Sequence, residues 1–272
     1  MIPRAYIDEW RSTAPWSQDA WVEQDLIISR ALVELFGVPD IGKRLAFRGG
    51  TAIYKLHVHP AARYSEDIDL VQPNAEPIGE TFDLVRSILD PWLGTPKREL
   101  KDGRSNLVYR FQSEGAPPIK LRLKLEINTR EHFTELGLMT IPLHVENRWF
   151  SGTTNVTTFA PEELFGTKLR ALYQRKKGRD LFDLWMALDQ GIVNATVLLH
   201  CFNRYMTEGG HSVTRALFEE NLHHKSNDAA FRGDIAPLVR PGVAWDFDHA
   251  LRVVSERIIA LLPGEPWKGP GG

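Results

Sequence analysis

The stretch FRGGTAIYKLHVHPAARYSEDIDLVQ, residues 47–72, contains the pattern that decides the fold. Two glycines, Gly49 and Gly50, stand before a short helical segment, and two aspartates, Asp67 and Asp69, stand on a strand that follows a loop. Carboxylates two residues apart on a strand point to the same side and can chelate one hard cation. The stretch therefore predicts a site for Mg²⁺ or Mn²⁺.

The glycine pair gives that site a second component. Gly49 and Gly50 let the backbone approach phosphate oxygens, and a helix that follows them offers its N-terminal N–H groups to anions. Thr51 adds a hydroxyl group. Together these features predict a site for a metal-bound triphosphate, although either one alone is weak, because D-x-D pairs and Gly-Gly turns are common.

A third carboxylate comes from a later strand. Residues 119–129, IKLRLKLEINT, alternate as a strand does, with one apolar face predicted to be core: Leu121, Leu123, Leu125 and Ile127. Glu126 lies on the opposite, polar face near the strand's end. With Asp67 and Asp69 it could hold two metal ions about 3.5–4 Å apart, as in nucleotidyl transfer.

The remaining pattern predicts an α+β half followed by a helical half. Residues 17–37 read as a helix capped by Ser17, residues 79–93 are helical until Pro91, and strands are expected near 106–112 and 155–159. Gly178 divides a helical stretch, and residues 192–262 are mainly helical. We expect a core with a small mixed sheet over residues 1–160, a helical domain over 161–263, and a disordered tail over 264–272.

Composition excludes several classes. The chain has 272 residues, 43% of them hydrophobic, and a formal net charge of −2, so no global basic surface suggests nucleic-acid binding. The single cysteine, Cys201, excludes internal disulfides and a thiolate-rich zinc site. No apolar run approaches the ~20 residues of a membrane span and no signal peptide is evident, so a cytoplasmic protein is expected.

Two segments are locally basic. Basic residues outnumber acidic ones between Lys97 and Arg130, which could place a basic flank beside the acidic site. A second run comprises Arg175, Lys176, Lys177 and Arg179. That run is either a solvated helix end or a track for RNA phosphates.

Three further polar residues flank this second run. Lys168 stands at the margin of a predicted apolar helical stripe, from which a lysine could reach a phosphate. Asp180 and Asp183 lie one turn apart, and can either cap the next helix or orient Arg179 and Lys168. The sequence leaves these alternatives open.

The motifs FRGGTAIYKL, RYSEDIDL and LKLEIN resemble the nucleotidyltransferase superfamily with a DNA polymerase β-like core. The stretch FAPEELFGTKLRALYQRKKGRDLFDL narrows the resemblance to the AbiEii/AbiGii abortive-infection toxins, which include the MenT-like toxins. The resemblance implies metal binding by Asp67, Asp69 and Glu126, and nucleotide binding by the glycine motif, Ser65 and Lys168. It also implies a functional aspartate at Asp180 or Asp183.

The same resemblance implies a Mg²⁺-dependent toxin that transfers a nucleoside monophosphate from an NTP to an acceptor, foremost a tRNA 3′ end. Glu126, or a water held by the metal, would take the proton of the acceptor hydroxyl. An antitoxin encoded nearby is implied, without a need for direct contact. Alternatives are transfer to a protein hydroxyl or a small molecule, a non-catalytic GTP- or RNA-binding module, and a D-x-D glycosyltransferase, against which the short glycine-led core argues.

Overall fold

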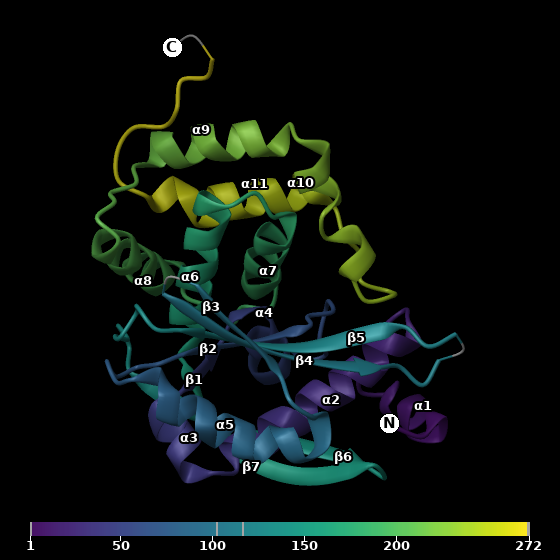
Figure 1. Ribbon diagram of the computed structural model, residues 1–272. Coiled ribbons are helices and arrows are strands. Elements are labelled where there is room, and N and C mark those ends of the chain that lie inside the picture. The colour runs from purple at the N-terminus through teal and green to yellow at the C-terminus, as the bar shows by residue number, and fades with distance from the viewer. Residues whose placement is uncertain (1, 102, 116, 271–272) are drawn as a thin grey trace. The chain divides into compact units, whose positions relative to one another are not determined.

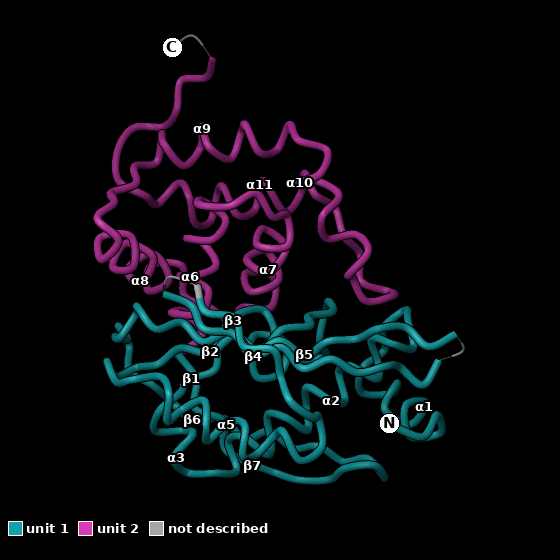
Figure 2. The backbone as a smooth tube through the Cα atoms, viewed as in Figure 1, with its two compact units in different colours: residues 1–159 teal, residues 160–272 magenta. Residues whose placement is uncertain are grey.

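A seven-stranded mixed sheet organises the first part of the chain. The computed structural model describes residues 2–101, 103–115 and 117–270, which divide into two units, Met1–Phe159 and Ala160–Gly272 (Figure 2). The strand order is β3-β4-β5-β2-β1-β7-β6. The strands are β1 (Ala46–Arg48), β2 (Asp67–Val71), β3 (Lys97–Lys101), β4 (Arg104–Gln112), β5 (Lys120–Asn128), β6 (Leu138–Asn147) and β7 (Phe150–Phe159).

Two long helices pack on this sheet. Helix α2 contacts β5, β6 and β7, and α5 contacts β4 (Figure 1). The helical segments of this unit are α1 (Arg4–Trp10), α2 (Asp19–Phe36), α3 (Pro39–Arg44), α4 (Gly49–Ala52), the π-helical turn η1 (Ile53–His57) and α5 (Ile78–Leu93). The apolar side chains of α2 and of the strands form the core between them, which leaves the opposite face of β5 and β2 for polar residues.

Alternation along β5 confirms the predicted core face. Leu121, Leu123, Leu125 and Ile127 are all buried, while the residues between them are exposed or half-buried. The central strands pair in parallel, with Asp67 opposite Lys124 and Asp69 opposite Glu126. Residues that are paired across neighbouring strands point to the same face. The acidic residues of both strands therefore share the polar face of the sheet.

Several predicted details are wrong. Gln18, not Ser17, is the N-cap of α2, and it makes no side-chain capping bond. Helix α5 continues through Pro91 to Leu93 before ending at Gly94, whose φ is +77°. Proline removes one helical hydrogen bond, and here this happens in the last turn, where buried Leu89 and Leu93 anchor the helix.

The sequence patterns also missed several elements, among them helix α3. Helix α1 and strands β3 and β6 were not predicted, whereas β4, β5 and β7 were. The sheet is mixed, as predicted, but with seven strands it is larger than predicted. Strand β6 is exposed over most of its first half, so its apolar residues do not alternate with burial there.

The second unit is helical. Gly178 begins a new helix after α6, as predicted. The helical segments are α6 (Pro161–Gln174), α7 (Gly178–Asp189), α8 (Ala195–Glu208), α9 (Arg215–Ser226), α10 (Ala229–Gly233), η2 (Ala236–Leu238), α11 (Phe247–Arg257) and η3 (Ile259–Leu261). In the C-terminal tail, the Trp267 N–H donates to the Glu219 carboxylate at 2.7 Å. Residues 271–272 of that tail lie outside the described residues.

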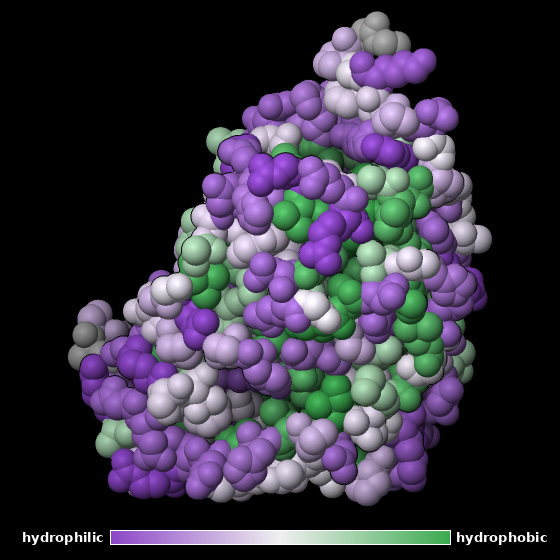
Figure 3. Space-filling view, turned by 180° about the vertical axis from the view of Figure 1, so that it is seen from behind, coloured by the Kyte–Doolittle hydropathy of each residue, from purple (hydrophilic) through white to green (hydrophobic). Residues whose placement is uncertain are grey.

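Figure 3 shows hydrophobic residues on one face of the molecule as patches that hydrophilic side chains interrupt. Within the described residues, no helix combines the length and the apolar character that crossing a bilayer requires.

Candidate active site

The glycine pair makes the turn that brings the chain against the acidic residues. Gly49 has a φ of +80°, a region that favours glycine, and a Cβ there would lie 2.1 Å from Asp69 Oδ2. A Cβ at Gly50 would lie 2.7 Å from Arg63 Nη2. Gly49 therefore needs to be glycine, and a side chain at Gly50 would displace the end of the Arg63 side chain.

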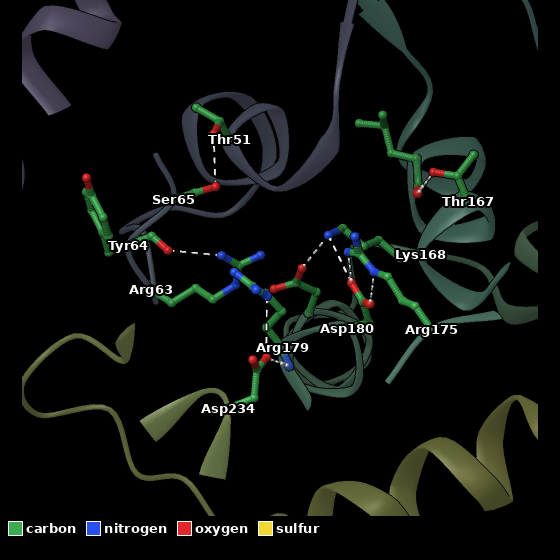
Figure 4. Close-up of polar contacts among 12 residues, drawn as sticks. Thr51, Arg63, Tyr64, Ser65, Thr167, Lys168, Arg175, Arg179, Asp180 and Asp234 are labelled. Atoms are coloured by element: carbon green, nitrogen blue, oxygen red, sulfur yellow. Dashed lines mark hydrogen bonds and ion pairs between the residues drawn. The ribbon is translucent and has the colours of Figure 1, made fainter. Parts of the chain in front are cut away.

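Hydroxyl groups connect this turn to β2. Thr51 Oγ1 lies 2.9 Å from Ser65 Oγ and 2.5 Å from the carbonyl oxygen of Asp67 (Figure 4). A hydroxyl has one proton to donate, so Thr51 donates to the carbonyl and accepts from Ser65. The contact fixes the orientation of the Ser65 hydroxyl beside Gly50, whose Cβ position is 3.0 Å from Ser65 Oγ.

Arg63 adds a positive charge that the sequence reading did not assign to the site. Its guanidinium is buried beside Gly50 and donates to the carbonyl oxygen of Tyr64 at 3.0 Å. It also lies 4.9 Å from the ring centroid of Tyr54. The available signal was an arginine two residues before Ser65, in the loop that leads into the acidic strand.

The pKa of Asp67 reflects a buried and crowded carboxylate. Burial, followed by the negative charge of Asp69, raises the pKa of Asp67 to about 6. Its Oδ1 is buried and has no hydrogen-bond partner within the described residues. Such an oxygen is a suitable ligand for a cation, because a cation would offset both the burial and the repulsion.

Glu126 is not free to complete that ligand set. Lys124 donates to Glu126 Oε2 at 2.5 Å, and Arg104 Nη1 lies 3.4 Å from Oε1. Burial raises the pKa of Glu126, but the hydrogen bond from Lys124 and the charges of Lys124, Arg104 and Arg48 outweigh it and hold the pKa below its usual value. The ammonium group of Lys124 thus takes the place beside Glu126 that a metal ion would need.

The fit for a divalent ion is accordingly partial. Asp67 and Asp69 provide two carboxylates on one face, with Glu126 next to them in register. No group of three or more His, Cys, Asp or Glu side chains is arranged to hold a metal ion among residues 2–101, 103–115 and 117–270. A third ligand from Glu126 requires that Lys124 release it.

The second unit contains a separate charged cluster around Lys168. Its Nζ lies 3.3 Å from Asp180 Oδ1 and 3.0 Å from Asp183 Oδ2. Arg175 donates two hydrogen bonds to Asp180, at 2.7 and 2.8 Å (Figure 4). Lys168 was predicted at the margin of the apolar stripe of its helix, but it lies on the buried face of α6, because its side chain is only 8% exposed.

Asp180 and Asp183 both contact Lys168 and both are fully buried. Burial raises the pKa of Asp180, but Lys168 and then Arg175 outweigh it and hold the pKa below its usual value. The sequence left open whether these aspartates cap the next helix or orient Arg179 and Lys168. In the structure they contact Lys168. Arg179 instead lies 3.4 Å from Asp234.

The basic run at residues 175–179 is exposed but faces carboxylates. Arg175 contacts Asp180, as described above. Lys176 pairs with Asp228, and Lys177 lies 3.5 Å from Asp234. These cations remain at the surface, with local acidic partners that lower the net charge they present to a polyanion.

The comparisons with known proteins agree with this architecture. Residues 30–253 match the sequence profile of the family described as nucleotidyl transferase AbiEii toxin, type IV TA system. Because the match covers most of the chain, the protein belongs to this family of nucleotidyltransferase toxins. The family implies an NTP substrate and an antitoxin partner. No curated protein matches the chain in sequence.

Solved structures share the fold. The MenT4 nucleotidyltransferase toxin of Mycobacterium tuberculosis superposes with a TM-score of 0.67 at 16% identity, over 97% of this chain and 91% of that one. The JHP933 protein of Helicobacter pylori gives a TM-score of 0.54 at 17% identity, over 89% of this chain and 91% of that one. The predicted α+β nucleotidyltransferase fold is therefore confirmed.

Proposed function

We propose that this nucleotidyltransferase uses Mg²⁺ or Mn²⁺ to transfer a nucleoside monophosphate from an NTP to the 3′-hydroxyl of a tRNA, which would block translation and growth. The observation that supports the chemistry is the register of β2 and β5, which gathers Asp67, Asp69 and Glu126 beside the glycine turn. The tRNA acceptor rests on the family resemblance and on the exposed basic run.

Each site residue that the first unit contributes has a role in this proposal. Asp67 and Asp69 hold the metal, whose charge, when it is bound, polarises the α-phosphate and stabilises the departing pyrophosphate. The backbone of Gly49 and Gly50 approaches the triphosphate. The Ser65 hydroxyl donates a hydrogen bond to the triphosphate once its hydrogen bond with Thr51 is broken. Arg63, buried next to Gly50, adds positive charge near the same oxygens.

The reaction forms a bond between the acceptor oxygen and the α-phosphorus and breaks the bond from that phosphorus to the oxygen bridging to the β-phosphate. Pyrophosphate leaves with the bridging oxygen. We assign one of two roles to Glu126: it takes the proton of the acceptor hydroxyl, or it is the third ligand of the metal. Lys124, once released from Glu126, can donate to a phosphate oxygen.

In the second unit we propose that Lys168 contacts the nucleotide and that the run from Arg175 to Arg179 contacts RNA. The role of Lys168 rests on its position in the family motif. Its contacts with Asp180 and Asp183 support a fixed orientation of the ammonium group. Asp180 is then a positioning residue.

The test is incubation of the purified protein with total RNA and each labelled NTP in turn, with Mg²⁺ and with EDTA. We expect label on tRNA and release of pyrophosphate with Mg²⁺ only. Label on protein or on a small molecule would support the alternative acceptors. Tight RNA binding without pyrophosphate release, in EDTA as in Mg²⁺, would support a non-catalytic binding module.

A further inference from the structure

The amide side chain of Asn106 lies on the same face of the sheet as the proposed metal ligands. Asn106 on β4 pairs with Glu126 on β5, and Glu126 pairs with Asp69 on β2. Residues that are paired across neighbouring strands point to the same face. Asn106, Glu126 and Asp69 therefore form one row of side chains across three adjacent strands.

Asn106 is buried although its face of the sheet is polar. The residue is 5% exposed, and its Oδ1 is almost inaccessible to solvent and has no hydrogen-bond partner within the described residues. A buried acceptor without a donor is unfavourable. Because solvent does not reach this oxygen, a neighbouring side chain is the nearest source of the donor that it lacks.

Lys124 is the cation best placed to supply that donor. It lies on β5 two residues before Glu126, diagonal to Asn106. Diagonal neighbours on one face of a sheet lie about 7–8 Å apart, within reach of a long side chain. Among the described cations that flank the amide, the side chain of Lys124 is the least exposed, at 23%, compared with 57% for Lys97 and 63% for Arg104.

Metal binding would force Lys124 to change its partner. Lys124 donates to Glu126 at 2.5 Å, and Glu126 can act on the metal or on the acceptor only after this bond breaks. A metal at the two aspartates of β2 repels an ammonium group, so Lys124 has to move away from β2, which in the order β4-β5-β2 means toward β4. The neighbouring side chains on that face of β4, Arg104, Val108 and Arg110, contain no acceptor. The buried amide is the acceptor that remains.

We propose that Asn106 is a positioning residue of the active site, whose Oδ1 accepts a hydrogen bond from Lys124 when Glu126 turns to the metal. Lys124 thus moves between two acceptors on the polar face, Glu126 without metal and Asn106 with metal. The ammonium group stays protonated in both positions. This inference rests on the proposed function, in which carboxylates of β2 and β5 hold the metal.

The test is a double-mutant cycle on Mn²⁺ affinity, measured by electron paramagnetic resonance of free Mn²⁺. Asn106→Leu removes the acceptor and should weaken Mn²⁺ binding about 5- to 10-fold, because Lys124 then has no second partner. In a Lys124→Met protein the same substitution should change Mn²⁺ affinity by less than about 2-fold, because no ammonium group has to move. Asn106→Ala serves the same test if Asn106→Leu does not fold.

Two controls accompany the cycle. Gln112→Leu removes an amide from the same face of β4, opposite Lys120, and should leave Mn²⁺ affinity unchanged. Urea denaturation in EDTA gives a readout without metal. Asn106→Leu should not lower the midpoint there, since Oδ1 makes no hydrogen bond to the described residues in the metal-free protein.

Equal weakening of Mn²⁺ binding in both Lys124 backgrounds, or a lower urea midpoint in EDTA, would show a structural role for Asn106 and overturn the inference. Unchanged Mn²⁺ affinity of Asn106→Leu would also overturn it. The variant Asp67→Asn/Asp69→Asn separates this failure from failure of the proposed function. If that variant binds Mn²⁺ as the wild type does, the metal site itself is wrong. If it loses Mn²⁺ while Asn106→Leu binds normally, only the inference fails.

Discussion

The acidic face of the first unit and the Lys168 cluster of the second unit both combine carboxylates with basic side chains, yet they balance charge differently. Asp180 and Asp183 are fully buried, and Lys168 contacts both. Asp67 and Asp69 are half-buried, with one Asp67 oxygen lacking a hydrogen-bond partner in the described chain. Within the described residues, Asp67 on the acidic face therefore keeps one oxygen without a hydrogen-bond partner, whereas Asp180 and Asp183 each contact a buried lysine.

The pKa values of the two clusters show the consequence. The pKa of Asp67 is raised to about 6 by burial and by Asp69, whereas Lys168 and Arg175 overcome the effect of burial and lower the pKa of Asp180. Burial alone thus does not decide whether the pKa of a carboxylate is raised or lowered. A carboxylate whose cation is missing is suited to bind one, and a carboxylate whose cations are built into the fold stabilises that fold.

The largest expected effect is on catalysis. Asp67→Ala or Asp69→Ala should abolish nucleotidyl transfer, by about 1,000-fold or more, because several kcal/mol of charge stabilisation are lost. The fold should persist, since neither side chain belongs to the core. Transfer is measured with labelled NTP and RNA, and growth inhibition is measured on induction. Growth inhibition close to that of the wild type by either variant would show that these aspartates are not the metal ligands.

The second effect is on stability and belongs to the other cluster. Lys168→Met should lower the free energy of unfolding by about 3–5 kcal/mol, because Asp180 and Asp183 lose a buried cation. Urea denaturation measures the change. The double variant Lys168→Met/Asp183→Asn should recover part of the loss and allows the NTP KM to be measured in a folded protein. A loss below about 1 kcal/mol for the single variant would contradict the stabilising role.

The third effect distinguishes the clusters by pH. Because the folded pKa of Asp67 is near 6, above its ordinary value, its contribution to stability is lost as pH rises through 6. Asp67→Asn should therefore raise the free energy of unfolding at pH 7.5 by about 1–2 kcal/mol. The difference from wild type should shrink between pH 6 and pH 4. A difference that is constant over this range would indicate that Asp67 titrates normally.

The fourth effect concerns the cation that holds Glu126. Lys124→Met should tighten Mn²⁺ binding about 3- to 10-fold, because Glu126 no longer has Lys124 as a partner. Binding is followed by electron paramagnetic resonance of free Mn²⁺. Arg122→Met is the matched control, since Arg122 lies on the same face of β5 but faces Glu66 at 3.7 Å. An equal change of Mn²⁺ affinity in both variants would show that only the net charge matters, and not the release of Glu126.

The smallest effect is expected in the basic run. Lys176→Glu/Lys177→Glu should weaken RNA association several-fold. The slope of log K against the logarithm of the salt concentration should become shallower by about 1 for each phosphate contact that is lost. The effect is limited because Asp228 and Asp234 already face these lysines. Filter binding at several salt concentrations measures it. Loss of NTP affinity in parallel would point to a nucleotide role or to misfolding.

Local patterns sufficed for much of the candidate site. The glycine pair, the D-x-D strand and the alternation of β5 are short-range features, so Gly49, Asp67 and Glu126 could be placed on their elements from sequence. Strand β3 and the first half of β6 were missed because they are largely exposed and lack the apolar alternation that marks a half-buried strand. Ser17 and Pro91 were misread because a capping residue and a helix breaker are preferences that packing can override.

The sequence by itself determined the class of the protein, because residue types and their spacing fix which side chains share a strand face and which family motifs are present. Only the tertiary structure decided how each charge is compensated. The parallel pairing of β2 with β5 set Asp67 beside Lys124, and the packing of β4 against β5 brought Arg104 to Glu126. The packing of α6 on α7 buried Lys168 between two aspartates. Compensation depends on distance and burial in space, and residues far apart in sequence decide both.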